Sequence, residues 1–122
     1  MAQTYIFGDI VMYKNRIHTI INTLGLNNYE LSYIRHSVNR AELSGVPLTT
    51  EILEKNGWKK SKTNDYAYFY YKDGLFLTYT SKDGKFWLDD FDYSSSICVE
   101  LPYIHSLQHL LFGLGINHEM EV

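Results

Sequence analysis

The sequence predicts a small α+β protein with two antiparallel β-regions, a short helix between them and a closing helix. Three observations support this class: extended segments with alternating apolar and polar residues, Asp-Gly pairs between aromatic runs, and two segments with helix start and stop signals. At 122 residues the chain has the usual size of one domain. We therefore expect a single domain over residues 1–122, within which residues 1–45 (β-rich) and 46–122 (helix, sheet, helix) can form subdomains.

The first 45 residues have the pattern of a small β-meander or partial barrel. Residues 10–13 and 17–21 are rich in β-branched side chains and flank turn residues 14–15, which predicts a strand pair. Residues 29–34 alternate with period two and predict a third strand. Residues 38–43 are expected to be extended as well.

Residues 46–57 carry the signals of a short helix. Thr49 can cap the first turn, Glu51 lies beside the positive end of the helix dipole, and Asn56-Gly57 supplies a left-handed termination. The expected helix covers residues 50–56.

An aromatic antiparallel sheet of three to four strands is predicted after this helix. Residues 59–65 are polar and are expected to be flexible. Asp-Gly at residues 73–74 and 83–84 separates apolar or aromatic runs, which is the strongest short hairpin signal in a sequence. The predicted strands are residues 66–71, 75–80, 85–88 and 97–101.

The chain is expected to close with a second helix. Pro102 stands where a first helical position is expected, and Gly113 or Gly115 can end the helix. Residues 118–122 are expected to fray. The face predicted to be buried contains Tyr103, Leu107, Leu110 and Leu114.

The formal net charge of −3 is unevenly distributed. Residues 1–62 carry eight Lys and Arg against five Asp and Glu (+3), whereas residues 63–122 carry three against nine (−6). Because long nucleic acid is held mainly through its phosphates, overall acidity argues against such a partner and leaves room for a local small-anion site.

The sequence shows no sign of export or membrane insertion. No apolar run approaches the ~18 to 20 residues that cross a bilayer, and the N-terminus lacks a basic region and an apolar core. The lone Cys98 has no disulfide partner in the chain and is expected to be a small buried apolar residue. These features predict a cytoplasmic protein.

No catalytic motif is recognisable in the sequence. Gly-x-Ser-x-Gly is missing, and Gly113-x-Gly115 stands at a helix end, where the dipole repels anions. We expect no catalytic residues, no cofactor and no enzymatic activity.

His105 and His109 are the first candidates for metal ligands, because i, i+4 spacing places two imidazoles side by side. A packed or solvated helix face is the preferred interpretation, since a tetrahedral site needs three or four ligands. Asp83, Asp89, Asp90 and Asp92 lack calcium-loop spacing, Asp83 already has a turn role, and a solvated loop is the preferred interpretation. The sequence therefore predicts no metal site.

The Tyr-rich strand is the candidate ligand surface. Tyr66, Tyr68 and Tyr70 alternate along one side of a strand, and aromatic residues occur on strands expected to be adjacent. Such rings can stack on a base, with nearby lysines meeting a phosphate. The alternative is that one face is core and the other is ordinary cross-strand packing. The candidate ligand-binding residues are Tyr66, Tyr68, Tyr70, Tyr79, Trp87, Lys59, Lys60 and Lys62.

Two segments carry a family resemblance. Residues 46–58 contain Pro-Leu-Thr before the first helix and Gly-Trp after it, and residues 97–113 contain Tyr-Ile-His-Ser-Leu-Gln. In these motifs and in the order of its elements, the chain resembles a family of small uncharacterised proteins from phages, prophages and mobile elements of gut bacteria. The resemblance covers most of the chain, and it implies no established activity and no catalytic residues.

These expectations lead to one function and two alternatives. The first is a non-catalytic phage-type accessory protein in the host cytoplasm that sequesters a small ligand, specifically a nucleotide-derived host immune signal. The second is an interaction module that binds a host protein through its acidic second half. The third is an unrecognised hydrolytic enzyme. A homo-oligomer is compatible with each.

Overall fold

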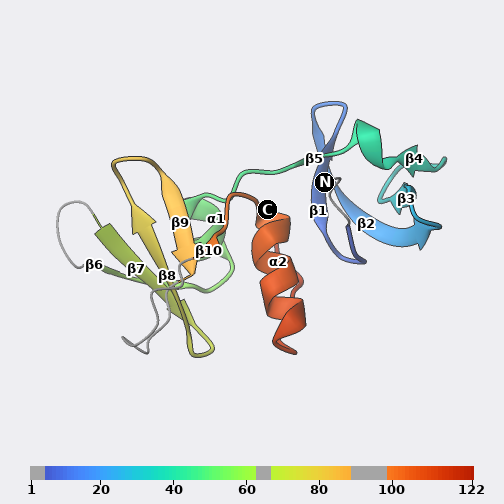
Figure 1. The fold of residues 1–122 in the computed structure, drawn as a ribbon. Coiled ribbons are helices and arrows are strands. Elements are labelled where there is room, and N and C mark those ends of the chain that lie inside the picture. Colours follow the sequence, from blue (N-terminus) through green and yellow to red (C-terminus); the bar gives the residue numbers. More distant parts are fainter. Residues whose placement is uncertain (1–4, 63–66, 89–98) are drawn as a thin grey trace. The chain divides into compact units, whose positions relative to one another are not determined.

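The computed structural model describes residues 5–62, 67–88 and 99–122, which form two five-stranded antiparallel sheets, two α-helices and one 3-10 turn (Figure 1). The α+β class predicted from the sequence is confirmed. Neither described helix is long and apolar enough to cross a bilayer.

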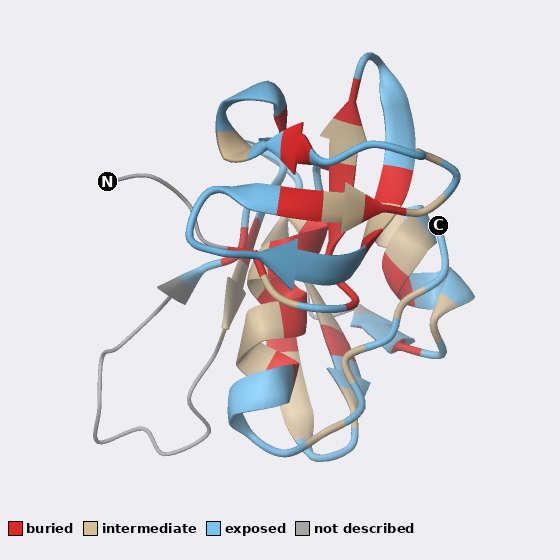
Figure 2. Ribbon diagram, turned by 90° about the vertical axis from the view of Figure 1, so that its right-hand side faces the viewer, coloured by how far each residue is buried: buried red, intermediate tan, exposed pale blue. Residues whose placement is uncertain are grey.

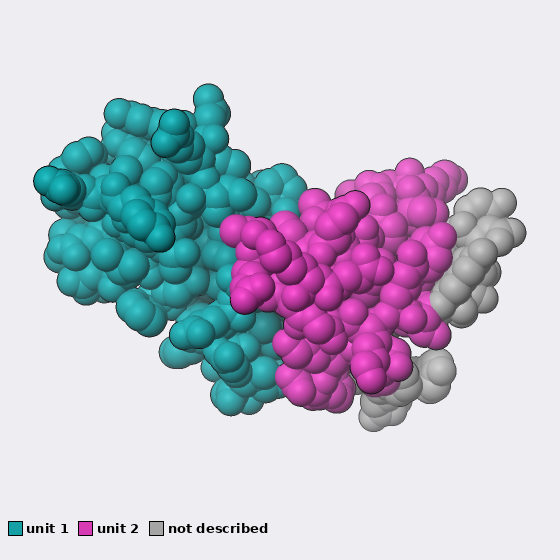
Figure 3. All heavy atoms as spheres, turned by 180° about the vertical axis from the view of Figure 1, so that it is seen from behind, with its two compact units in different colours: residues 1–47, 103–120 teal, residues 48–102, 121–122 magenta. Residues whose placement is uncertain are grey.

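The chain divides into two compact units (Figure 3). Unit 1 comprises residues 1–47 and 103–120, and unit 2 comprises residues 48–102 and 121–122. The chain leaves unit 1 near the boundary expected from the sequence. The closing helix, however, groups with unit 1 and not with the second half of the chain.

The sheet of unit 1 has the strand order β4-β3-β2-β1-β5. Its end strands do not pair with each other, so the described sheet is open and does not close into a barrel. A bulge interrupts the β2–β3 register between Ile20 and Asn22. The strands are β1 (Ile10–Tyr13), β2 (Arg16–Leu24), β3 (Asn28–Leu31), β4 (Val38–Asn39) and β5 (Ser44–Gly45).

Buried side chains from β1 to β4 form the core of unit 1, and Figure 2 colours buried residues red. Strand β1 has no exposed position and β2 buries His18 and Ile20. The side chains with no exposed surface include Val11, Ile20, Leu31 and Val38. Each such side chain contributes about 1.5–3 kcal/mol by leaving water. The predicted turn between β1 and β2 is confirmed, because residues 14 and 15 both have positive φ.

The segment 38–43 is not one extended strand as expected. After two residues of β4 the chain forms a 3-10 turn, η1 (Arg40–Glu42). The Asn39 side chain accepts a hydrogen bond from the Ala41 N–H, and the Glu42 carboxylate accepts one from the Asn39 N–H. This capping box stabilises the turn against a continued strand.

The closing helix α2 (Ile104–Gly113) begins two residues later than Pro102. Tyr103 is the N-cap, with extended φ and ψ of −125° and 159°, because it forms an isolated antiparallel bridge with Pro47. The predicted face is also corrected, since only Leu107 of its four residues is buried. The buried residues are Ile104, His105, Leu107, Gln108 and Leu111.

Gln108 is the main polar link between α2 and the start of β1. Its side-chain oxygen accepts a hydrogen bond from the Ile10 N–H (2.9 Å), and its side-chain nitrogen donates to the Gly8 carbonyl (2.7 Å) and the His118 carbonyl (3.0 Å). All polar atoms of the buried amide are therefore used, as burial requires.

The sheet of unit 2 has the order β10-β9-β8-β7-β6 and contains one strand more than the three to four expected. The additional strand is β6, in the segment predicted to be flexible. It pairs with β7 over four positions. It is an edge strand of the sheet, and lysines are common in edge strands because their charge opposes pairing with another chain. The strands are β6 (Lys59–Lys62), β7 (Ala67–Lys72), β8 (Leu75–Thr80), β9 (Lys85–Leu88) and β10 (Val99–Glu100).

The first helix and the hairpins of unit 2 follow the sequence prediction closely. Helix α1 (Thr50–Lys55) is capped by Thr49, whose hydroxyl accepts from the Ile52 N–H, and Gly57 has a φ of +87°. Asp73 and Gly74 both have positive φ and join β7 to β8 as a two-residue turn.

One face of the unit 2 sheet is its core. Tyr70, Leu77 and Phe86 are buried there, and Tyr70 lies beside Thr50 and Glu54 of α1. The last two residues of the tail do not fray as expected, because the Asn56 side chain exchanges two hydrogen bonds with the backbone of Glu121.

Candidate functional site

The predicted Tyr and Lys residues do not form one surface. Tyr70 is fully buried, whereas Tyr68 and Tyr79 are half-buried neighbours whose rings stack with centroids 6.3 Å apart. The Lys60 ammonium lies 4.2 Å from the Tyr68 ring centroid. Tyr66 lies outside the described residues.

Trp87 points to the opposite face of the sheet. Tyr79 pairs with Phe86 in the β8–β9 register, so Trp87 pairs with Thr78 and alternates to the other side. Lys59 pairs with Tyr71, which also belongs to that other face, while Lys62 pairs with Tyr68. The expectation of one continuous surface is corrected, because a strand pair places neighbouring residues on alternate faces.

Of the predicted residues, Lys60, Lys62, Tyr68 and Tyr79 share the face of Tyr70 by register, and the described contacts join Lys60, Tyr68 and Tyr79. Ligand binding by this group stays a prediction. The acidic residues Asp89, Asp90 and Asp92, and also Cys98, lie outside the described residues, so the interaction-module alternative stays a prediction too.

His105 and His109 lie in a polar cluster inside unit 1. The ring of His105 stacks on Tyr103, with centroids 5.3 Å apart and an interplanar angle of 7°. The His109 Nε2 donates to Asp9 Oδ2 at 2.6 Å. Within the described parts of the chain, no group of three or more His, Cys, Asp or Glu side chains could hold a metal ion.

Asp9 organises the segment that precedes β1. Its carboxylate has no exposed surface, and its Oδ2 also accepts a hydrogen bond from the Ile6 N–H at 2.8 Å. The Asp9 N–H in turn donates to the Ile6 carbonyl at 3.0 Å. The Gly8-Asp9 turn expected from the sequence is thus closed by hydrogen bonds between Ile6 and Asp9, and His109 of α2 binds its carboxylate.

Burial changes the protonation of two members of this cluster. Burial lowers the pKa of His105 from its ordinary value, and the nearby carboxylate of Asp9 only partly opposes this. Burial likewise raises the pKa of Tyr5, whose ring lies 5.2 Å from that of His105. At neutral pH both side chains are therefore uncharged.

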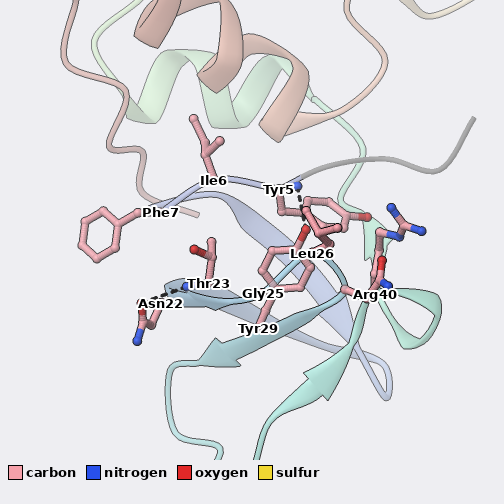
Figure 4. Close-up of a pocket in the computed structure, with 10 residues that line it drawn as sticks. Tyr5, Ile6, Phe7, Asn22, Thr23, Gly25, Leu26, Tyr29 and Arg40 are labelled. Carbon is pink, nitrogen blue, oxygen red and sulfur yellow. Dashed lines mark hydrogen bonds between the residues drawn. The ribbon is translucent and has the colours of Figure 1, made fainter.

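A cavity of about 610 Å³ lies in unit 1, between residues 5–7 and the β2–β3 hairpin. Figure 4 shows Tyr5, Tyr29 and Arg40 on one side of it and Phe7 and Asn22 on the other. The Tyr5 N–H donates to the Tyr29 hydroxyl at 3.2 Å, which holds the N-terminal segment across the hairpin. The lining residues are Tyr5, Ile6, Phe7, Asn22, Thr23, Gly25, Leu26, Asn27, Tyr29 and Arg40.

Arg40 brings a positive charge to this cavity. Its backbone N–H donates to the Asn27 carbonyl at 2.7 Å, which fixes η1 against the hairpin loop. In the ranges that the structure describes, the guanidinium forms neither a hydrogen bond nor an ion pair. Its charge acts on the Tyr5 hydroxyl, where it partly offsets the effect of burial on the pKa.

The rim of the cavity is unusually apolar. Phe7 is 62% exposed and Leu26 is 88% exposed, although both are large hydrophobic side chains. A ligand seated between them would bury apolar surface that now faces water.

No family model, curated protein or solved structure matches the chain.

Sequence reasoning missed this cavity because its walls are distant in sequence. The contact that closes it joins Tyr5 to Tyr29, 24 residues apart. One signal was available: Phe7 and Leu26 are large apolar residues placed beside glycine turns, where burial is not expected.

Proposed function

We propose that this protein is a non-catalytic binding protein that captures a small anionic ligand in the cavity of unit 1. The observation that carries the proposal is the Arg40 guanidinium, which has no hydrogen-bond or ion-pair partner among the described residues and lies beside aromatic walls in a cavity of about 610 Å³. Sites for small molecules and cofactors commonly have about 300–1,000 Å³ and a few polar groups among apolar walls.

The lining favours a ligand with a planar part and a phosphate. Guanidinium binds phosphate oxygens through two parallel hydrogen bonds, while exposed Phe7 offers a ring face for stacking. Asn22 and Asn27 supply amide donors and acceptors at the same cavity. A nucleotide-derived signal has both features, and it is the specific form of the proposal.

Capture without turnover is supported by the chemistry of the lining. None of the ten residues that line the cavity carries a carboxylate, imidazole, amine or thiol, so the lining supplies no such base to activate the hydroxyls of Tyr5, Thr23 and Tyr29. Hydrolysis of a phosphate ester would require a base, a nucleophile or a metal at the reacting atom. Sequestration requires affinity alone.

The test is a thermal unfolding series with cyclic dinucleotides, ADP-ribose and the matching nucleosides without phosphate. A ligand at about 100 times its Kd stabilises the folded state by about 2.7 kcal/mol, which raises Tm by several degrees. We expect at least one phosphate-bearing compound to do so and its nucleoside to have a much smaller effect.

Arg40→Gln should abolish the Tm increase, and Phe7→Ala should reduce it. Lys82→Gln, at an exposed position in the β8–β9 turn of unit 2, is the matched control and should retain it. Equal Tm increases for the wild type and Arg40→Gln, or no response to any compound, would contradict the proposal.

A further inference from the structure

A cationic surface lies at the end of the unit 1 sheet opposite the cavity. Lys14 lies in the β1–β2 turn, Arg16 is the first residue of β2, and the loop after β3 carries Arg35 and His36. Tyr13 brings the two segments together, because its ring lies 6.5 Å from that of His36 and 5.3 Å from the Lys14 ammonium. We call Lys14, Arg16, Arg35 and His36, together with Tyr33, the basic end.

The cations of the basic end have no anionic partner in the ranges that the structure describes. Among the described residues, the ion pairs join Lys85 to Glu100 and His109 to Asp9, and neither pair includes a residue of the basic end. The Lys14, Arg16 and Arg35 side chains are exposed, so their charge faces solvent.

The acidic residues of the unit 1 sheet are placed elsewhere. Glu42 is held in the capping box of η1, and Glu30 pairs with Asn22 near the β2–β3 hairpin. The nine residues of β2 separate that hairpin from the β1–β2 turn by roughly 26 Å at about 3.3 Å per residue. The basic end is therefore a local field of one sign, although the whole chain is acidic.

Tyr33 gives this surface an exposed ring. Its side chain is 98% exposed and its backbone φ is +64°, a left-handed conformation that a bulky residue rarely adopts. The adjacent Ser32 fixes the turn, because its carbonyl accepts from the His18 Nδ1–H and its hydroxyl accepts from the Thr19 N–H. A strained aromatic residue held out in solvent gains nothing from packing, which points to a recognition role.

We propose that the basic end binds single-stranded nucleic acid, with backbone phosphates on Lys14, Arg16 and Arg35 and an unpaired base stacked on Tyr33. Phosphates satisfy the unpaired cations, and an exposed ring can stack on any base. Single strands fit better than duplex, because a base inside a duplex offers no free face to a side chain. This contact is local, so it differs from the wrapping of long nucleic acid that the overall charge opposes.

Fluorescence anisotropy with a labelled oligothymidylate of about 15 nucleotides tests the proposal. We expect a Kd of about 10⁻⁶–10⁻⁴ M near physiological salt. Three phosphate contacts predict that log K falls with log salt with a slope of about −2. A duplex of equal length should bind more weakly.

Tyr33→Gly separates recognition from folding. Glycine adopts positive φ without strain, so the variant should have an unchanged or higher Tm while its affinity for the oligonucleotide falls about ten-fold. Replacing Lys14 and Arg35 together by Ala should reduce the salt slope by about two-thirds. Lys82→Ala, an exposed position of unit 2 outside the basic end, should bind as the wild type does.

Two outcomes would overturn the proposal. One is the absence of measurable binding at about 50 mM salt, where phosphate contacts are strongest. The other is binding that Tyr33→Gly leaves unchanged and that polyglutamate competes as well as the oligonucleotide does, which would identify an acidic polypeptide as the partner. Because Arg40 lies in the cavity and not at the basic end, failure here leaves the ligand proposal untouched.

Discussion

His105 shows how one side chain depends on its surroundings. Two features oppose a charge on it: it is buried, and its Nδ1 has no hydrogen-bond partner among the described residues. Gly45 makes this packing possible, because a side chain there would begin 2.6 Å from the Tyr103 ring that stacks on His105. The imidazole is thus buried in α2 against Gly45 of β5, in surroundings that keep it neutral.

Protonation of His105 should make stability depend on pH. Its pKa is lowered in the folded state, whereas the unfolded chain titrates near its ordinary value of about 6.5. Below that value the unfolded chain binds a proton that the folded chain resists, so stability falls as the pH is lowered, by at most about 1.4 kcal/mol per pH unit. His105→Phe should flatten this dependence.

Urea unfolding at a series of pH values between 7 and 5 measures the effect. His36→Phe, at an exposed position, is the matched control. A slope that is the same for His105→Phe and the wild type would show that another group is responsible.

The position of helix α2 depends on the side-chain amide of Gln108. Gln108→Ala leaves the Ile10 N–H and the Gly8 carbonyl buried without their partner, and each such group costs about 1–3 kcal/mol. We expect a loss of about 2–4 kcal/mol in the free energy of unfolding, measured by urea titration. Leu114→Ala, which is 53% exposed at the end of the same helix, should change it by less than about 0.5 kcal/mol.

The elements that the sequence predicted well are those with local causes. Thr49 and Gly57 delimit α1, and Asp73-Gly74 fixes the β7–β8 turn, because cap and turn conformations depend on a few neighbouring residues. Strand β6 escaped prediction because Lys59–Lys62 becomes a strand only by pairing with β7. The same limit applies to the candidate site, where Arg40 and Tyr5 meet across segments with no shared motif.

The predicted aromatic surface shows a second limit. Tyr68 and Tyr70 do share one face of their strand as predicted. Tyr70, however, is buried in the core, and Trp87 lies on the opposite face of the sheet from Tyr79. Period-two patterns assign residues to faces within one strand. They do not set the register between strands or say which face is covered, and both depend on the tertiary structure.

Unit 1 is discontinuous in sequence, because it combines residues 1–47 with residues 103–120. Residues 103–120 contribute Ile104, Leu107 and Leu111 to its buried residues, in addition to Gln108. Burial of these three aliphatic side chains contributes about 1.5–3 kcal/mol each. Their combined contribution is comparable with the free energy of unfolding of a typical domain, about 5–15 kcal/mol.

A chain that ends at Pro102 should therefore lose the structure of unit 1. Amide hydrogen exchange is the measurement: we expect protection to disappear from β1 and β2 and to persist in β7 and β8. A chain that ends at Met120 is the control and should keep protection in both sheets. Retained protection of β1 and β2 without residues 103–120 would contradict this dependence.

The discontinuity also dictates an order of events while the protein is being made. Residues 1–47 leave the ribosome first, yet the helix that completes their fold is translated only after the whole of residues 48–102. At synthesis rates of about 5–20 residues per second, the early β-hairpins wait several seconds for their last partner. The aromatic sheet can fold during that interval, so the segment synthesised first is the one whose fold is completed last.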